Sequence, residues 1–282
     1  MERVQRTTVV TLVLATCLYS VVLAETRKEY RYTVGPNANI SVDTQYGAIS
    51  VKPGTGTEVV VTATSQSDKT EVDSTQRGNR IEIASHLLPG ADQQTGRVDY
   101  ELLIPEDTTL SLRSSTGPLS AENLHGDLTL EGTDAVVNVH NVSNGHVHVR
   151  TMRGAVNLTD VSNGHIEISS ISGPVTMKSV TGPWVRANSG SGKIFYDGDF
   201  GSGGDYKFST HTGDIEAIVP ANTSADFSAH SILGKVQNQL DLMPQHTRYT
   251  FEEGRSFFGT VGKAASKVVL HSFSGKIRLK QR

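Results

Sequence analysis

Turn residues recur at a nearly constant spacing through the middle of the chain, and this spacing limits the fold more than any other feature. Eight glycines and one alanine follow one another at intervals of 9 or 10 residues, so that two steps make 18 or 19: Gly117, Gly126, Ala135, Gly145, Gly154, Gly164, Gly173, Gly182 and Gly192. Each step predicts one short strand and one turn. No helical periodicity of useful length occurs after residue 24.

Apolar and polar residues alternate between these turns, as they do in strands with one buried face. The positions expected to face inward are Leu128/Leu130, Val147/Val149, Ile166/Ile168 and Val185/Ala187 in one set of strands, and Leu119/Ala121, Val137/Val139, Val156/Leu158, Val175/Met177 and Ile194/Tyr196 in the other. Such a unit cannot bury its apolar face alone, but stacked copies form a continuous core. The sequence therefore predicts an all-β fold, a β-solenoid resembling a right-handed parallel β-helix with about 19 residues per coil. An antiparallel sandwich is the alternative, but it has no reason to keep this register.

The pattern becomes less regular toward both ends of the chain. Segments 206–220, 226–237 and 268–279 share a strand, a histidine, a glycine and a second strand. Phe208 and Phe227 are 19 residues apart, which predicts that the first two of these segments form neighbouring coils. Residues 25–107 are expected to form an irregular N-terminal β cap, and residues 108–282 the repeat region of one continuous domain. The aromatic residues of an insertion at 241–266 predict a partner-binding hairpin or a cover over the end of the stack.

The first 24 residues have the features of a secretory signal peptide. A short cationic start, MERVQR, precedes an apolar stretch that ends in Val22-Leu23-Ala24. We expect an exported protein in the periplasm, at the cell surface or outside the cell, with no transmembrane span in its mature chain. Cys17 is the only cysteine and leaves with the signal, which excludes disulfides and thiolate sites. The remaining charge, 24 basic against 28 acidic groups, predicts no nucleic-acid partner.

Several segments resemble a known family. YGAISV, TGPLSAENLHGDLTL, RGAVNLTDV, SGPVTM and TGDIEAIVP repeat a glycine followed by alternating aliphatic residues, and SGKIRLK forms a closing strand. Over roughly residues 35–280 these units are similar to the bacterial β-strand-repeat family known as "putative adhesin", a domain of unknown function. The resemblance implies a β-solenoid on an exported protein and supplies no catalytic residues.

The pentapeptide VSNGH occurs twice, at 142–146 and 161–165. Its Asn-Gly pair is expected to form a positive-φ turn, and the valines to fill the corners of successive coils. In the 19-residue register the outward positions form one column of Asp127, His146, His165 and Trp184, and a second that includes His148, Glu167 and Arg186. These seven residues are the candidate ligand face.

The residue types of this face point to two kinds of ligand, a metal ion and a sugar. His146 and His165 would stand about 5 Å apart, close enough to share a metal ion. Asp127 would lie two coils from His165, too far to complete the site, so no metal is expected. The ring of Trp184 favours a sugar instead. The alternative without a ligand is a solvated strand face on which His148, Glu167 and Arg186 form cross-strand pairs.

Catalytic and cofactor motifs are missing from the sequence, so no cofactor is expected. The segment DGDFGSGGD (197–205) contains three aspartates but lacks the twelfth-position carboxylate of an EF-hand, and we interpret it as a flexible loop. No Gly-x-Ser-x-Gly, His-Glu-x-x-His or phosphate-binding loop occurs. The predicted function is a non-enzymatic adhesin or cell-envelope scaffold that binds a surface glycan or an envelope protein. A polysaccharide hydrolase or lyase on the same scaffold is the alternative, and the oligomeric state stays open.

Overall fold

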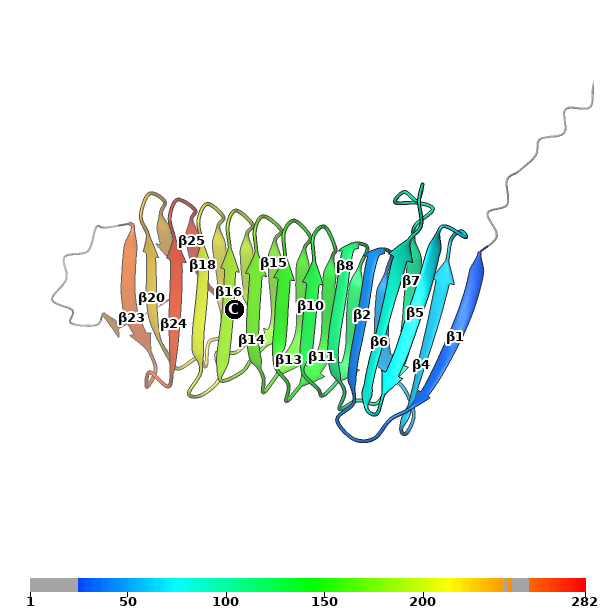
Figure 1. Cartoon of the computed structure of the whole chain (residues 1–282). Helices are drawn as coiled ribbons and strands as arrows, with labels where there is room; N and C mark the ends of the chain where they lie inside the picture. Colours follow the sequence, from blue (N-terminus) through cyan, green and yellow to red (C-terminus); the bar gives the residue numbers. More distant parts are fainter. Residues whose placement is uncertain (1–24, 241–242, 245–253) are drawn as a thin grey trace, which may run out of the picture.

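The computed structural model describes residues 25–240, 243–244 and 254–282 (Figure 1). The expected signal peptide, residues 1–24, and residues 241–242 and 245–253 of the expected insertion lie outside this range. The described residues contain 25 strands, arranged in one 12-stranded and one 13-stranded sheet, and no helix. The all-β prediction is confirmed. In this part of the chain nothing is helical, long and apolar enough to cross a membrane.

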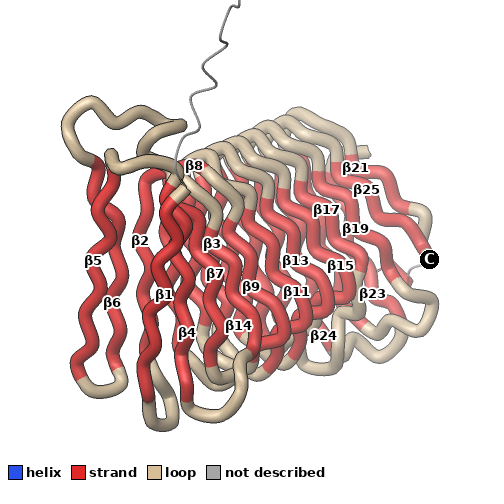
Figure 2. Tube along the Cα trace, turned by 90° about the vertical axis from the view of Figure 1, so that its right-hand side faces the viewer, coloured by secondary structure: helices blue, strands red, loops and turns tan. Residues whose placement is uncertain are grey.

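The two sheets run the length of the molecule. Sheet A has the order β1 (Thr26–Thr33), β4 (Glu58–Ser65), β7 (Val98–Ile104), β3 (Ile49–Pro53), β9 (Leu119–Leu124), β11 (Val137–Ser143), β13 (Val156–Ser162), β15 (Val175–Val180), β17 (Ile194–Asp197), β19 (Ile215–Val219), β25 (Ile277–Gln281) and β21 (Val236–Asn238). Sheet B has the order β22 (Met243–Pro244), β23 (Ser256–Val261), β20 (Ala225–Ser231), β24 (Ser266–Ser272), β18 (Asp205–Thr210), β16 (Trp184–Ser189), β14 (His165–Ser170), β12 (Val147–Thr151), β10 (Leu128–Gly132), β8 (Thr109–Thr116), β2 (Asn39–Tyr46), β6 (Arg80–Leu87) and β5 (Thr70–Arg77). From β8 to β21 the chain alternates between the sheets, so that one strand of each makes a coil, and the coils stack side by side (Figures 1 and 2).

Equivalent residues of successive coils pair in parallel. In sheet B, Leu128 pairs with Val147, Val147 with Ile166, and Ile166 with Val185. Every residue expected to face inward in the two sets of strands is buried in the space between the sheets. Outward-facing polar residues also align, and Asn157 Nδ2 donates a hydrogen bond to Asn138 Oδ1 on the neighbouring strand at 2.9 Å. The alternation therefore gives one continuous core with ladders of like residues along it.

Antiparallel strands close both ends of the stack. At the N-terminal end β1 pairs with β4, β4 with β7, and β5 with β6. At the other end β23 pairs with β20 and with β22. The outermost strands β1 and β5 have the polar sequences TRKEYRYT and TEVDSTQR. Charged residues on an edge strand hinder its pairing with another chain.

The order of the coils at the C-terminal end differs from the prediction. β24 lies between β18 and β20, where Figure 1 shows it in red between yellow and orange strands. Tyr206 pairs with Val268, and Val268 with Phe227, so the expected neighbours Phe208 and Phe227 do not share a register. The prediction that 206–220 and 226–237 are adjacent was wrong, because the C-terminal coil inserts between them and supplies the pairing partners of both.

The two VSNGH segments form equivalent turns. Asn144 and Asn163 have φ of 62° and 58°, in the left-handed region that asparagine tolerates. The glycines that follow do not have positive φ; they are needed because a β-carbon on Gly145 would overlap the carbonyl oxygen of Gly126 in the preceding coil. Val142 and Val161 are buried at the corners, as predicted. In each Asn-Gly pair the asparagine therefore supplies the positive φ, and the glycine is required for the close contact with the preceding coil.

Candidate functional site

The predicted ligand face lies on the outer surface of sheet B, across β10, β12, β14 and β16. Asp127 precedes β10 and accepts a hydrogen bond from the backbone N–H of His146 at 2.8 Å, with the His146 Nδ1 atom 3.1 Å from the same oxygen. These hydrogen bonds lower the pKa of the Asp127 carboxyl below its usual range. The start of the column is therefore fixed by contacts between adjacent coils.

The rings of the column follow one another along the stack. The centroids of His146 and His165 are 4.9 Å apart with an angle of 86° between the planes, and those of His165 and Trp184 are 6.0 Å apart. The guanidinium of Arg186 lies 4.3 Å from the centre of the Trp184 ring. One face of that ring is thus in contact with a cation, which leaves less of it for a sugar.

The second column is only partly paired. His148 Nδ1 lies 3.5 Å from Glu167 Oε2. Glu167 and Arg186 are register partners, but no ion pair joins them, and Arg186 Nε is buried without a hydrogen-bond partner among the described residues. The expected cross-strand pairing is therefore present for His148 and Glu167 and wrong for Arg186, whose side chain turns to Trp184 instead.

The side chains that commonly bind metal ions are those of His, Cys, Asp and Glu. In the ranges that the structure describes, no group of three or more His, Cys, Asp or Glu side chains could hold an ion. Two of the three aspartates of 197–205 have other contacts: Asp197 pairs with Arg282, and Asp199 Oδ1 accepts a hydrogen bond from the Gly201 N–H at 3.2 Å.

The expected flexible loop at 197–205 is anchored in the core. Phe200 is 1% exposed, and its ring lies 4.8 Å from that of Tyr196, 5.1 Å from Tyr206 and 5.4 Å from Phe227. Burial raises the pKa of Tyr196, whose hydroxyl donates to the Val180 carbonyl at 2.7 Å. The segment is a loop between β17 and β18, as predicted, and Phe200 fixes it to the core because its ring fills space between the sheets where the coil is longer.

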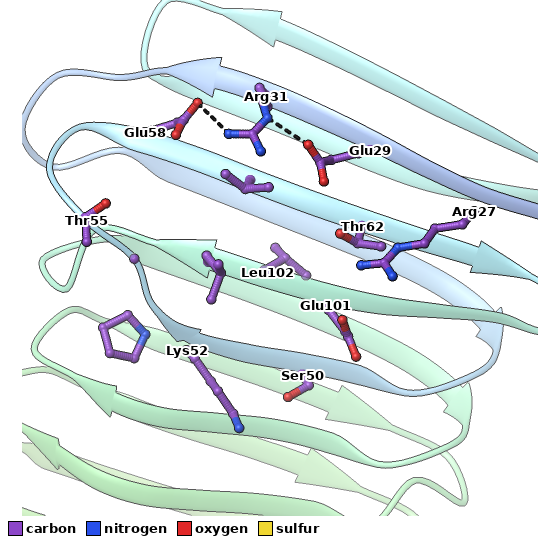
Figure 3. Close-up of a pocket in the computed structure, with 14 residues that line it drawn as sticks. Arg27, Glu29, Arg31, Ser50, Lys52, Thr55, Glu58, Thr62, Glu101 and Leu102 are labelled. Carbon is purple, nitrogen blue, oxygen red and sulfur yellow. Dashed lines mark hydrogen bonds and ion pairs between the residues drawn. The ribbon is translucent and has the colours of Figure 1, made fainter.

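A second candidate site is a groove of about 590 Å³ on the outer surface of sheet A at its N-terminal end (Figure 3). It lies across β1, β4, β7 and β3. Arg31 binds two carboxylates at one end, with Nε 2.7 Å from Glu29 and Nη1 3.2 Å from Glu58. Arg27 and Glu101 lie toward the other end and form no ion pair with any residue the structure describes (Figure 3).

The groove combines balanced charge with an apolar part. Val60 and Leu103, which is 46% exposed, form the apolar part. Three cations and three carboxylates also line the groove: Arg27, Arg31 and Lys52, and Glu29, Glu58 and Glu101. Such a surface suits an uncharged polar ligand better than an ion. Sequence reasoning missed this groove, because antiparallel pairing brings β1 and β7 to β4 and the repeat period does not predict that pairing.

Comparisons with known proteins give one family match and several similar solved structures. A family model described as Toastrack DUF4097 matches residues 37–280. A structure described as a "putative adhesin" from Bacteroides fragilis NCTC 9343 is 12% identical, covers 91% of this chain and 98% of its own, and has a TM-score of 0.52. A "putative adhesin" from Parabacteroides distasonis ATCC 8503 is also 12% identical, covers 91% of this chain and 97% of its own, and has a TM-score of 0.44. A search of curated proteins found no match.

Proposed function

Because the chain belongs to the Toastrack DUF4097 family, we propose that it is a non-enzymatic, exported β-repeat protein that acts as an adhesin or as a scaffold in the cell envelope. Its partner in this proposal is a surface glycan or an envelope protein. The signal-like start of the sequence supports export to the periplasm, the cell surface or the medium. The description of the Bacteroides fragilis structure as a "putative adhesin" agrees with this function.

The observation that carries the proposal is the alignment of outward side chains from coil to coil. Asp127, His146, His165 and Trp184 come from four different turns of the chain and form one line along sheet B. Adjacent strands are about 4.8 Å apart, so a flat face of this kind offers similar contacts at regular intervals. An extended partner can add many weak contacts on it.

The fold supports an interpretation as a β-solenoid. Pairs such as Leu128 with Val147 and Val156 with Val175 correspond to a regular coil of 19 residues. In this interpretation β1, β4 and β5 are the N-terminal cap that keeps the sheets from pairing edge to edge.

A binding array tests the proposal. We expect the purified protein to bind at least one member of an array of envelope glycans and envelope proteins. The variant His146→Ala/His165→Ala/Trp184→Ala should weaken that binding at least tenfold if the sheet B face is the contact surface. A control variant, His86→Ala/His125→Ala, removes exposed histidines elsewhere and should bind like the wild type. An absence of binding across the array would contradict the proposed function.

The groove of Figure 3 is the place to test the alternative, a carbohydrate-active enzyme. Glycoside hydrolysis needs one carboxyl group to donate a proton and a second to act as base or nucleophile. Glu29 and Glu58 lie close enough to share Arg31, and both accept hydrogen bonds from its guanidinium. Release of reducing ends from envelope polysaccharides by the wild type, and its loss in Glu58→Gln, would favour the enzyme over the adhesin.

A further inference from the structure

The C-terminal end of sheet A carries an unusual concentration of positive charge on its outer surface. The surface is formed by the outward positions of β15, β17, β19, β25 and β21 and by the residues next to the ends of these strands. It carries seven cations: Lys178, Lys193, Lys235, Lys276, Arg278, Lys280 and Arg282. It carries three carboxylates: Asp197, Asp214 and Glu216. The whole chain has a net charge of −3. We call this surface the cationic face.

Its carboxylates are fully engaged by cations. Glu216 binds Lys193 Nζ and Lys280 Nζ, each at 2.7 Å, and these two lysines lower the pKa of its carboxyl to about 2. Arg278 Nη1 lies 3.1 Å from Asp214 Oδ2. Arg282 pairs with Asp197. These ion pairs join β25 to β19 and β17, and they leave none of the three carboxylates to neutralise further cations.

Three lysines of the cationic face take no part in these ion pairs. Lys178, Lys235 and Lys276 are exposed, and none of them forms an ion pair with any residue that the structure describes. Lys235 and Lys276 precede the paired residues Val236 and Ile277, so they lie side by side on adjacent strands. With strands about 4.8 Å apart, the cationic face extends roughly 19 Å along the stack from β15 to β21. An extended anion fits this length better than a single small ion.

The face also contains features of a sugar-binding surface. Phe195 is half-buried on the outer side of β17, and Lys193 Nζ lies 5.5 Å from the centre of its ring. An aromatic ring beside cations can stack on a sugar while the cations bind its acid group. The exposed apolar side chains nearest to it, Leu233 and Phe273, lie in the turns before β21 and β25 and not at the outward positions of the five strands. A lipid surface, into which apolar side chains would insert, is therefore the less suitable partner.

We propose that the cationic face binds an acidic polysaccharide running along the stack, with Lys178, Lys235 and Lys276 as its free charged contacts. This inference rests on the proposed function for the kind of partner and adds a second surface, separate from the histidines of sheet B. Long-range attraction of a polyanion to such a face depends on ionic strength.

Titration with oligogalacturonates of defined length tests the inference. We expect saturable binding to the wild type that weakens as NaCl rises from about 0.05 M to about 0.5 M, and no binding of neutral dextran oligomers. Lys178→Gln/Lys235→Gln/Lys276→Gln should weaken binding at least tenfold without loss of thermal stability, because these lysines form no ion pair. The matched control Lys28→Gln/Lys69→Gln/Lys263→Gln removes the same charge from exposed positions elsewhere and should change binding less than twofold.

Three outcomes would overturn the inference. One is equal weakening in the two triple variants, which would mean attraction by net charge alone. Another is stronger binding to vesicles containing anionic phospholipid than to the oligogalacturonates. The third is unchanged binding, by the Lys178/Lys235/Lys276 variant, of an acidic glycan that the wild type binds on the envelope array. This last result would leave the proposed function intact, whereas failure of the wild type to bind any member of the array would contradict the proposed function itself.

Discussion

Gly132 faces Ala135 across the turn that follows β10, and a β-carbon added to Gly132 would lie 2.6 Å from the Ala135 Cβ. The other turns on this edge have Ser or Thr at the first position and Gly at the fourth, as in Ser170 with Gly173. From Thr151 onward the hydroxyl bonds to the glycine backbone, for example from Ser170 Oγ to the Gly173 carbonyl at 2.8 Å, whereas Thr44 and Ser114 donate to the carbonyls of Tyr46 and Thr116. The space at each turn thus holds one small side chain, which in this coil comes from the fourth residue.

Exchanging the two residues tests this shared space. Gly132→Ser alone should reduce the free energy of unfolding by about 1–3 kcal/mol, because the new side chain overlaps the Ala135 methyl group. Gly132→Ser/Ala135→Gly restores the motif of the other coils and should recover most of that loss. Urea unfolding of both single variants and the double variant gives the coupling energy. Additive effects would contradict the shared space.

The Asn-Gly turn of VSNGH gives a second matched pair. Gly145→Ala should destabilise the protein by about 2 kcal/mol or more, because its β-carbon would overlap the carbonyl oxygen of Gly126. Asn144→Gly should change stability by less than about 1 kcal/mol, because glycine readily adopts the φ of 62° found there. Thermal unfolding of the two variants distinguishes steric contact between coils from backbone strain. A Gly145→Ala variant no less stable than Asn144→Gly would contradict a steric requirement for glycine between the coils at this turn.

The regular coils could be predicted because the same short rules apply in each. Alternation placed Val147, Ile166 and Val185 in the core, and the repeat placed His146 beside His165. The motif of Ser or Thr three residues before Gly was also readable, since it repeats at Thr44, Ser114, Thr151, Ser170, Ser189, Thr210, Ser231 and Ser272. The cationic positions 276, 278, 280 and 282 follow the period of a strand as well.

The ends of the stack could not be derived in the same way. The insertion of β24 beside β18 joins residues 62 positions apart, such as Tyr206 and Val268, and no repeat period specifies that pairing. The groove on sheet A depends on the antiparallel placement of β1 and β4. Pairing of this kind joins strands that are far apart in the sequence, so no local pattern encodes it. The orientation of Arg186 toward Trp184 likewise depends on local packing that the register leaves open.

Phe200 gives a prediction about the longer coil. Phe200→Ala should reduce the free energy of unfolding by about 3–5 kcal/mol, because its ring is buried against Tyr196, Tyr206 and Phe227. Phe273→Ala is the control, since that ring is 37% exposed and stacks only on His211 among the described aromatic rings. Its effect should be about 1 kcal/mol or less. Chemical denaturation measures both, and similar values for the two variants would argue that Phe200 does not anchor the 197–205 segment.

The ion pairs of Glu216 should make the stability of the C-terminal coil sensitive to acid. Its pKa of about 2 in the folded protein lies below the ordinary value of 4.5 because Lys193 and Lys280 bind the carboxylate. Since the folded pKa is depressed, the ion pairs stabilise the protein fully above pH 4.5, and this stabilisation is lost as the pH falls toward 2. Glu216→Gln should therefore be less stable than the wild type by on the order of 2 kcal/mol at pH 7. The difference should shrink between pH 4.5 and pH 2. Lys193→Met and Lys280→Met, measured by the same denaturation series, should each remove part of the pH dependence. A difference that stays constant down to pH 2 would mean that Glu216 acts through packing and not through its charge.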